Sequence, residues 1–314
     1  MADSTDLILD NSKPIFMFSG QGSQKVGMGN DLADEPLAQE VFECASDIFG
    51  FDVQNTMATG PEETLNDTRY AQAAIIALSL ALERILKEKE QVPSAVLGFS
   101  LGQIAALHAS GMLSLEETFS LAHFRSQVMA DAAEHNKGAM CALLGADEKA
   151  AQELCDGASQ GEVLVAANFN CPGQIVISGS LDAIKRAQQM WTEQKKRSAL
   201  LATSGAFHSP LMQQAADELY KYLNKMAFKE PQVPLICNLD AKALSAANAA
   251  EHLSLHLTHP VRFHQSAQYL LEAGANTYIE VGFGGVLLGL MKRIDKSTNR
   301  ILIDSKASLD SFME

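Results

Sequence analysis

The sequence predicts an α/β protein with a mostly parallel sheet. Short apolar runs alternate with longer segments of helical periodicity over most of the chain, and this alternation is typical of parallel sheets covered by helices. The chain has 314 residues and is 47% hydrophobic, so it can build a sizeable core without disulfides or metals. We therefore expect one large α/β domain, or one large and one small domain.

Composition excludes several classes of function. The formal charge of −14 argues against nucleic acid and anionic membranes as partners. The first 13 residues are polar and lack the apolar centre of a signal peptide, and no run of about 18 apolar residues could span a membrane. Five scattered cysteines without a CxxC motif indicate free thiols in a reducing compartment, so we expect a cytoplasmic protein. They are Cys44, Cys141, Cys155, Cys171 and Cys237.

The first predicted strand, residues 15–18, leads into a glycine-rich loop. A dinucleotide-binding loop would need a third glycine three residues after Gly22 and an acidic residue at the end of a second strand, and neither is present. We therefore expect the loop to place backbone donors near the end of another strand. Gln21 is the best-placed candidate.

Helical periodicity then predicts helices over residues 31–48, from about residue 61, and over residues 71–87. An apolar strand over residues 95–97 runs into the pentapeptide Gly98-Phe99-Ser100-Leu101-Gly102, which a small-residue helix follows. Strand, sharp turn with serine, and helix form the layout of a nucleophile elbow. Its serine would stand at a helix N-terminus, where free N–H groups favour an oxyanion. Ser100 is thus the candidate nucleophile.

A capping box, Ser114 with Glu117, predicts a helix from residue 114 to about 133. Arg125 lies on the apolar face of this helix. Its stem could pack on that face while its head reaches solvent. Alternatively, the guanidinium is buried and awaits an anion, because arginine is suited to bidentate carboxylate binding. The pattern alone does not separate these two interpretations.

Residues 138–204 predict the order β-α-β-β-α-β, which is a ferredoxin-like arrangement. We expect this small subdomain to be inserted into a larger core made of residues 1–137 and 205–314. In the second half of that core, strands are expected over residues 233–237 and 278–281. Helices are expected to end near 226, before 260, near 273 and at 294.

A nucleophilic serine needs a base, usually histidine. His208 is favoured over the other seven histidines because it lies on a loop that leaves a strand, just before Ser209-Pro210 begins a helix. A hydrolase triad is poorly supported, because no histidine follows the late strand that ends at Glu280-Val281-Gly282. His252, His256, His259 and His264 lack an HExxH motif and a cysteine partner, so we expect no metal site.

Taken together, the ordered motifs resemble one family along nearly the whole chain. They are Phe18-Ser-Gly-Gln21-Gly-Ser-Gln, the Ser100 elbow, Arg125 before Met129, Asn168-x-Asn170-x-Pro172-Gly-Gln174, Phe207-His208-Ser-Pro-Leu-Met, Pro260-Val261 and Glu280-Val-Gly. This series resembles the malonyl-CoA:acyl carrier protein transacylases of type II fatty acid synthesis. The resemblance implies a hydrolase-like α/β core with an inserted ferredoxin-like subdomain. It also implies malonyl-CoA and an acyl carrier protein as partners, and no cofactor.

The resemblance further implies a role for each site residue. Ser100 would be the nucleophile and His208 the general base, oriented by a backbone carbonyl at His256 instead of by an aspartate. The N–H groups of Gln21 and Leu101 would form the oxyanion hole. Arg125 would bind the malonate carboxylate.

Two positions depart from the family's usual pattern, which has histidine before the serine and glutamate after the glycine. Here these positions are Phe99 and Gln103. Phe99 removes a polar contact near the acyl group, whereas Phe207 and Leu101 match the malonyl-selective pattern. The alternatives are a free-standing acyltransferase of a polyketide synthase, a malonate-metabolising relative, and a serine thioesterase or other hydrolase. A non-catalytic scaffold is disfavoured because the nucleophilic and charged positions are all present.

Overall fold

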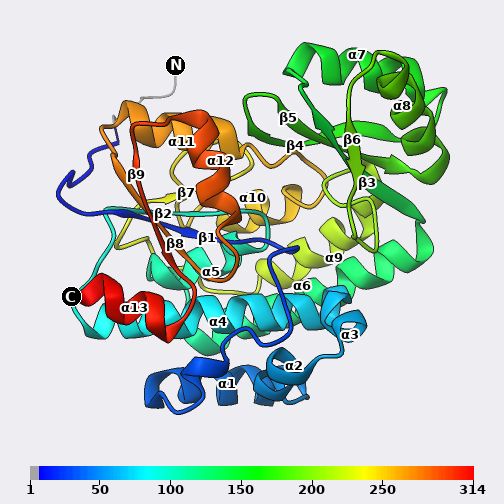
Figure 1. Cartoon of the computed structure of the whole chain (residues 1–314). Helices are drawn as coiled ribbons and strands as arrows, with labels where there is room; N and C mark the ends of the chain where they lie inside the picture. The colour runs from blue at the N-terminus through cyan, green and yellow to red at the C-terminus, as the bar shows by residue number, and fades with distance from the viewer. Residues whose placement is uncertain (1–6) are drawn as a thin grey trace.

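A parallel sheet forms the centre of the larger part of the molecule (Figure 1). The computed structural model describes residues 7–314. The sheet has five strands, in the order β7 (Leu235–Ile236), β2 (Ala95–Gly98), β1 (Ile15–Phe18), β8 (Thr277–Val281) and β9 (Asn299–Ile303). All four neighbouring pairs are parallel, so the carboxyl ends of the strands meet at one edge. The expected α/β class with a mostly parallel sheet is confirmed.

Each face of this sheet is covered by helices. The central strand β1 shows why, because Phe16 and Phe18 enter one core while Ile15 and Met17 enter another on the opposite face. In Figure 1, α4 and α6 lie along one face, and α11 and α12 lie on the other. The first core is built mainly on α1 (Pro36–Phe49), α4 (Thr68–Glu88), α5 (Gly102–Ala109), α6 (Leu115–His135) and α9 (Gln213–Leu223). The second is built on α11 (Phe263–Glu272) and α12 (Val286–Ile294).

A second, antiparallel sheet has its own core. Its order is β4 (Leu164–Cys171), β5 (Gln174–Ser180), β3 (Gly138–Leu144) and β6 (Ser198–Leu200). The helices α7 (Glu148–Ser159) and α8 (Leu181–Glu193) pack against it around the fully buried Trp191. The predicted element order β-α-β-β-α-β is confirmed, whereas the division of the chain into 138–204 and the remainder stays a prediction.

The two sheets meet where β4 approaches the larger core. Val261 pairs with this strand, because its N–H donates to Ala167 and its carbonyl accepts from Phe169, both at 2.9 Å. A cavity of about 460 Å³ is lined by β4 and β5 on one side, through Asn168 and Val176, and by the loop after β1 and by α12 on the other. A smaller cavity shares Gln21, Phe99, Asn168 and Leu201 with this one.

Most elements lie where the sequence placed them, but several do not. The helix expected over 31–48 is a 3-10 turn, Asn30–Leu32, followed by α1, which begins at Pro36 because proline suits the first helical turn. Three elements were not predicted: α2 (Val53–Thr59), β9 and α13 (Lys306–Met313). The remaining short helices are α3 (Glu62–Asn66), α10 (Ala249–Leu255) and a 3-10 turn at Pro210–Met212. Within the described residues, no helix combines the length and apolarity needed to cross a membrane.

Candidate active site

Ser100 stands in a strained turn between β2 and α5. Its φ is +50°, a left-handed conformation that non-glycine residues seldom adopt. The flanking glycines allow the turn, because a Cβ on Gly98 would lie 2.0 Å from the Gln103 nitrogen and one on Gly102 would lie 2.0 Å from the Phe18 carbonyl oxygen. The local geometry is that of the predicted nucleophile elbow.

His208 is held against Ser100 by a second left-handed residue conformation, with φ +58°. Its Nε2 lies 2.8 Å from Oγ of Ser100, and its Nδ1 lies 2.8 Å from the carbonyl oxygen of His256. Because a carbonyl only accepts, the ring proton sits on Nδ1, and Nε2 is free to accept from the serine hydroxyl. The structure thus brings together the three residues that the sequence analysis selected for nucleophile, base and orienting carbonyl.

The electrostatics of the site keep His208 neutral. Burial lowers the pKa of its ring from 6.5 to about 4; the hydrogen bond from Nδ1 to the carbonyl of His256 opposes this shift, and the positive charge of Arg125 adds to it. A neutral imidazole beside a serine hydroxyl is the form that can accept a proton.

Arg125 is buried, with 3% of its surface exposed, so the interpretation in which its head reaches solvent is wrong. Its Nη1 donates to Oε1 of Gln72 at 2.7 Å, and its Nη2 lies 3.4 Å from Oγ of Ser100. No carboxylate of the described residues pairs with it, and burial lowers its pKa to about 10. An unpaired buried cation is costly, and an anion beside Ser100 would offset that cost.

A small cavity of about 70 Å³ opens beside Ser100, His208 and Arg125. The residues that the sequence analysis selected for the oxyanion hole and the acyl pocket also line it, and their roles stay predictions: Gln21, Leu101, Phe99 and Phe207. Gln21, Phe99, Asn168 and Leu201 line both this cavity and the larger one between the sheets, so the two are continuous. A long substrate arm could therefore reach Ser100 through the larger cavity.

The two unusual positions, Phe99 and Gln103, have different surroundings. The ring of Phe99 packs on Phe263, with 5.6 Å between centroids, and contributes an apolar wall to both cavities. Gln103 is fully buried behind the elbow, where its Oε1 accepts from the N–H of Asn238 at 2.8 Å. Gln103 therefore belongs to the support of the turn, while Phe99 faces the substrate space.

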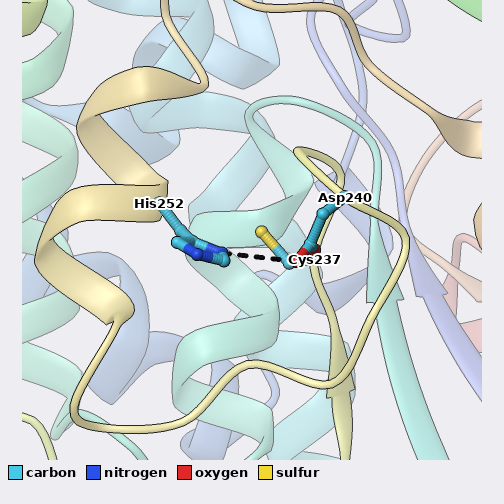
Figure 2. A group of neighbouring side chains, drawn as sticks. All are labelled: Cys237, Asp240 and His252. Carbon is cyan, nitrogen blue, oxygen red and sulfur yellow. Dashed lines mark ion pairs between the residues drawn. The ribbon is translucent and has the colours of Figure 1, made fainter. Parts of the chain in front are cut away.

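A cysteine, an aspartate and a histidine gather behind the elbow (Figure 2). His252 reaches from α10 toward Asp240 and Cys237 in the turn after β7, and their potential ligand atoms lie within 4.8 Å of one another. Sequence analysis found no cysteine partner for the histidines, and in this respect it was wrong, because the partner comes from a distant segment.

This group does not have the dimensions of a zinc site. Bonds of about 2.0–2.3 Å place tetrahedral ligand atoms about 3.3–3.8 Å apart, whereas Nδ1 of His252 lies 3.9 Å from Oδ2 of Asp240. Burial also raises the pKa of the Cys237 thiol to about 12, and its sulfur already accepts from Nε2 of Gln103 at 3.5 Å. We therefore assign no metal to it.

Sequence analysis missed two residues that contact the site directly. Gln72 is fully buried on α4 and holds the guanidinium of Arg125. Asn238 is fully buried after β7 and accepts from the backbone N–H of Ser100 at 2.7 Å. Neither belongs to a recognisable motif, and the only available signal was that Asn238 follows a predicted strand whose end would meet that of β2.

Comparison with known proteins agrees with this fold. Residues 15–305 match the family described as "Acyl transferase domain". The chain belongs to this acyl transferase family.

Its relatives are more specific. It is 36% identical to the malonyl CoA-acyl carrier protein transacylase of Bacillus subtilis, over 95% of this chain and 96% of that protein. It is 37% identical to the protein of the same name in Haemophilus influenzae, over 95% and 97%. The structure of the malonyl-CoA:acyl carrier protein transacylase of Xanthomonas oryzae superposes with a TM-score of 0.92 at 38% identity, covering 96% of this chain and 97% of that one. A malonyl-transacylase in complex with a type II polyketide acyl-carrier protein also superposes with a TM-score of 0.92, at 35% identity over 95% and 98%.

Proposed function

We propose that this protein transfers a malonyl group from malonyl-CoA to the thiol of an acyl carrier protein. The observation that carries the proposal is the buried guanidinium of Arg125, which has no acidic partner among residues 7–314 and lies 3.4 Å from Oγ of Ser100. A malonyl thioester ends in a carboxylate a few bonds from its reactive carbonyl. Binding that carboxylate at Arg125 would place the carbonyl at the serine.

In the first half-reaction, Oγ of Ser100 attacks the thioester carbonyl while Nε2 of His208 takes the hydroxyl proton. The carbonyl oxygen becomes an oxyanion that the N–H groups of Gln21 and Leu101 stabilise. When the intermediate collapses, the C–S bond breaks and the CoA thiolate takes the proton from His208. A malonyl-serine ester remains.

In the second half-reaction, the thiol of the carrier protein gives its proton to His208 and attacks the ester. The serine leaves with that proton, and the malonyl group stays on the carrier. The carbonyl of His256 keeps the imidazole of His208 in the required tautomer throughout.

The experiment that tests this proposal is the intact mass of the protein after mixing with malonyl-CoA. We expect the mass to rise by one malonyl group and to return when a carrier protein with a free thiol is added. Ser100→Ala should show no adduct. An undiminished adduct on Ser100→Ala would refute the assignment of the nucleophile, and loss of the thioester without any acceptor thiol would indicate a hydrolase.

The roles of the two histidines can be separated by matched substitutions. His208→Ala removes the base and should slow acylation by about 10²–10⁴-fold. His256→Ala keeps the backbone carbonyl and should cost much less. Equal losses would contradict the role of that carbonyl.

We place this transfer in fatty acid biosynthesis in the cytoplasm. The five free cysteines of the described residues suit a reducing compartment. A carrier protein of polyketide synthesis is the alternative acceptor, as in the complex of the structural relative. A lower KM for the fatty acid carrier than for a polyketide carrier supports the first assignment, and the reverse order supports the second.

A further inference from the structure

Asn238 is a fully buried residue that follows β7, and its side chain crosses to the nucleophile elbow. Its Oδ1 accepts from the N–H of Ser100 at 2.7 Å, and its Nδ2 donates to the carbonyl of Gly98, also at 2.7 Å. One amide group therefore bonds the backbone on both sides of Phe99. A carboxamide carries its acceptor and its donor on two separate atoms, so one side chain can bond two backbone groups at once.

These two bonds hold the turn at its most strained point. Ser100 has φ +50°, and such a conformation persists only where its surroundings over-determine it. Without a buried acceptor, the N–H of Ser100 would be left unsatisfied in the protein interior, which is itself costly. Asn238 thus stabilises the conformation that points the serine hydroxyl at His208.

The same bonds determine which backbone donor remains for the oxyanion. In the elbow, the N–H of Ser100 donates to Oδ1 of Asn238, and the N–H of Gly102 donates to the carbonyl oxygen of Phe99 at 2.9 Å. Leu101 lies between them and lines the small cavity. The N–H of Leu101 is therefore the elbow donor that an incoming carbonyl oxygen can engage.

Asn238 is fixed in turn by its neighbours. Its N–H donates to Oε1 of Gln103 at 2.8 Å, and its carbonyl accepts from the N–H of Arg262 at 2.9 Å. Gln103 lies in the first turn of α5, close to Ser100 in the sequence, so one short segment carries both the nucleophile and the support of Asn238. Nε2 of Gln103 completes the chain by donating to Sγ of Cys237 at 3.5 Å.

We propose that Asn238 is a positioning residue for the acyl transfer, and that Gln103 maintains its orientation. Asn238 touches neither the substrate nor the reacting atoms. It acts through Ser100, because it fixes the backbone that orients the serine hydroxyl. It also acts through Leu101, because its bond to the N–H of Ser100 leaves the N–H of Leu101 as the free donor. This inference rests on the proposed function for its substrate, but not for its nucleophile.

The main test is the rate of malonyl-serine formation in Asn238→Ala, measured by rapid quench and intact mass. We expect this rate to fall about 100-fold, as for a small misplacement of a reacting group, while the KM for malonyl-CoA changes little. A second readout is the rate at which an alkyl fluorophosphonate labels Ser100, and this rate should fall in parallel. Because the label needs no malonyl-CoA, it tests Asn238 even if the substrate assignment fails.

Asn238→Asp adds a pH readout that a merely structural role would not produce. Its ionised carboxylate can still accept from Ser100, but its second oxygen would oppose the carbonyl of Gly98. Protonation restores a donor there, and burial favours the protonated form. We expect acylation by Asn238→Asp to recover as the pH is lowered from 8 to 6, whereas that of the unmodified protein should not rise over this range.

Leu154→Ala is the matched control for lost stability. Leu154 is buried in the separate core under the antiparallel sheet, so its truncation should destabilise the fold without slowing acylation.

Gln103→Ala should slow acylation less than Asn238→Ala, and the double variant should be little slower than Asn238→Ala alone, because both act on the same turn. Unchanged acylation and labelling in a folded Asn238→Ala variant would overturn the proposal. A loss matched by a Leu154→Ala variant of equal stability would overturn it as well.

Discussion

Arg125 is the residue on which the proposed malonyl group depends. Its guanidinium is buried and bonds Gln72, but no acidic side chain of the described chain neutralises it. For malonyl-CoA, Arg125→Ala removes one partner of a buried charge pair, which costs about 2–5 kcal/mol. That is roughly a 30-fold to several-thousand-fold loss in kcat/KM. Acetyl-CoA has a methyl group at this place, so its kcat/KM should hold or rise. The measurement is kcat/KM for both thioesters on both proteins.

Arg125→Lys is the informative comparison for this prediction. It keeps the charge but loses the bidentate geometry, so malonyl-CoA should fall to an intermediate kcat/KM. Equal losses for malonyl-CoA and acetyl-CoA would mean that Arg125 is only structural.

His208 gives a second prediction at this scale, in the pH dependence. Its pKa is lowered from 6.5 to about 4, so it should remain an effective base well below pH 6. The acid limb of the acylation rate should have its midpoint nearer 4 than 6.5. Arg125→Ala removes a nearby positive charge and should move this midpoint upward. A midpoint at 6.5 in the unmodified protein would contradict the buried, neutral state of His208.

The same shift links pH to stability. Between about pH 6.5 and 4 the unfolded chain binds more protons at this histidine than the folded protein does. The contribution of neutral, buried His208 to the free energy of unfolding is therefore fully present above pH 6.5, and it is lost as the pH falls toward 4. The free energy of unfolding, measured by urea titration at several pH values, should fall over this window. The slope should be smaller in His208→Ala.

The residues that the sequence identified are those with local signals. Ser100 lies in a glycine-flanked turn, His208 precedes a helix cap, and Arg125 sits on an apolar face. The side chains that hold them, Asn238 and Gln72, come from segments 138 and 53 residues away, respectively. No local pattern marks such partners, because their role exists only once the strand ends have come together.

At the scale of elements, Glu280 connects the end of β8 to two neighbours. It is fully buried, its Oε1 accepts from the hydroxyl of Ser19 at 2.7 Å, and its Oε2 accepts from the N–H of Leu288 in the first turn of α12 at 2.9 Å. Ser19 precedes the loop that carries Gln21. One carboxyl group therefore anchors both the loop that carries Gln21 and the N-terminus of α12.

Glu280→Ala should lower the free energy of unfolding by about 1–3 kcal/mol, because it leaves two buried donors unsatisfied. It should also slow acylation, since the loop of Gln21 loses its anchor. Urea denaturation and rapid-quench kinetics measure the two effects. Ser305→Ala, which removes the cap of the remote α13, should cost about 0.5–2 kcal/mol and leave acylation unchanged. A slower acylation in both variants would mean that the rate only follows stability.

Predictability also varies among the elements. The start of α6 was predictable because the capping-box motif lies within four consecutive residues, Ser114 to Glu117. The structure confirms both hydrogen bonds of the box. By contrast, α2 was not predicted, because its seven residues are too few for a periodic pattern. The strand β9 is stabilised by pairing with β8, and sequence periodicity does not report such pairing.

At the scale of the whole molecule, charge governs the encounter with a carrier protein. Acyl carrier proteins are generally acidic, and this chain carries a formal charge of −14, so docking requires a local basic surface. Arg293 lines the larger cavity, and Lys292 is its exposed neighbour on α12. Lys195-Lys196-Arg197 precedes β6 and is a second basic run.

Charge reversal in Lys292→Glu and Arg293→Glu should therefore raise the KM for the carrier protein more than the KM for malonyl-CoA. Steady-state kinetics at two salt concentrations measure the effect, which should shrink at high salt. Lys149→Glu, on the exposed face of α7, makes the same change of charge away from the cavity and should leave both constants unchanged. If reversal at α7 and at α12 acts equally, net charge alone is responsible.

At this scale we also propose that residues 138–204 form a subdomain inserted into a core of residues 1–137 and 205–314. The four antiparallel strands have their own buried cluster around Trp191, which supports this division. The order of elements was readable from the sequence. The cavity between the sheets was not, because it depends on how β4 meets Val261.

The two glycines of the elbow limit how this protein can change over time. At Gly98 and at Gly102, any side chain would enter space that backbone atoms already occupy, at 2.0 Å, so random mutagenesis should return only glycine at both positions. The neighbouring positions are not restricted by backbone atoms in this way. Phe99 and Leu101 line the small cavity, and Gln103 supports Asn238. We therefore expect relatives that accept other acyl groups to differ at these neighbouring positions, and to keep both glycines and the backbone turn that presents the serine.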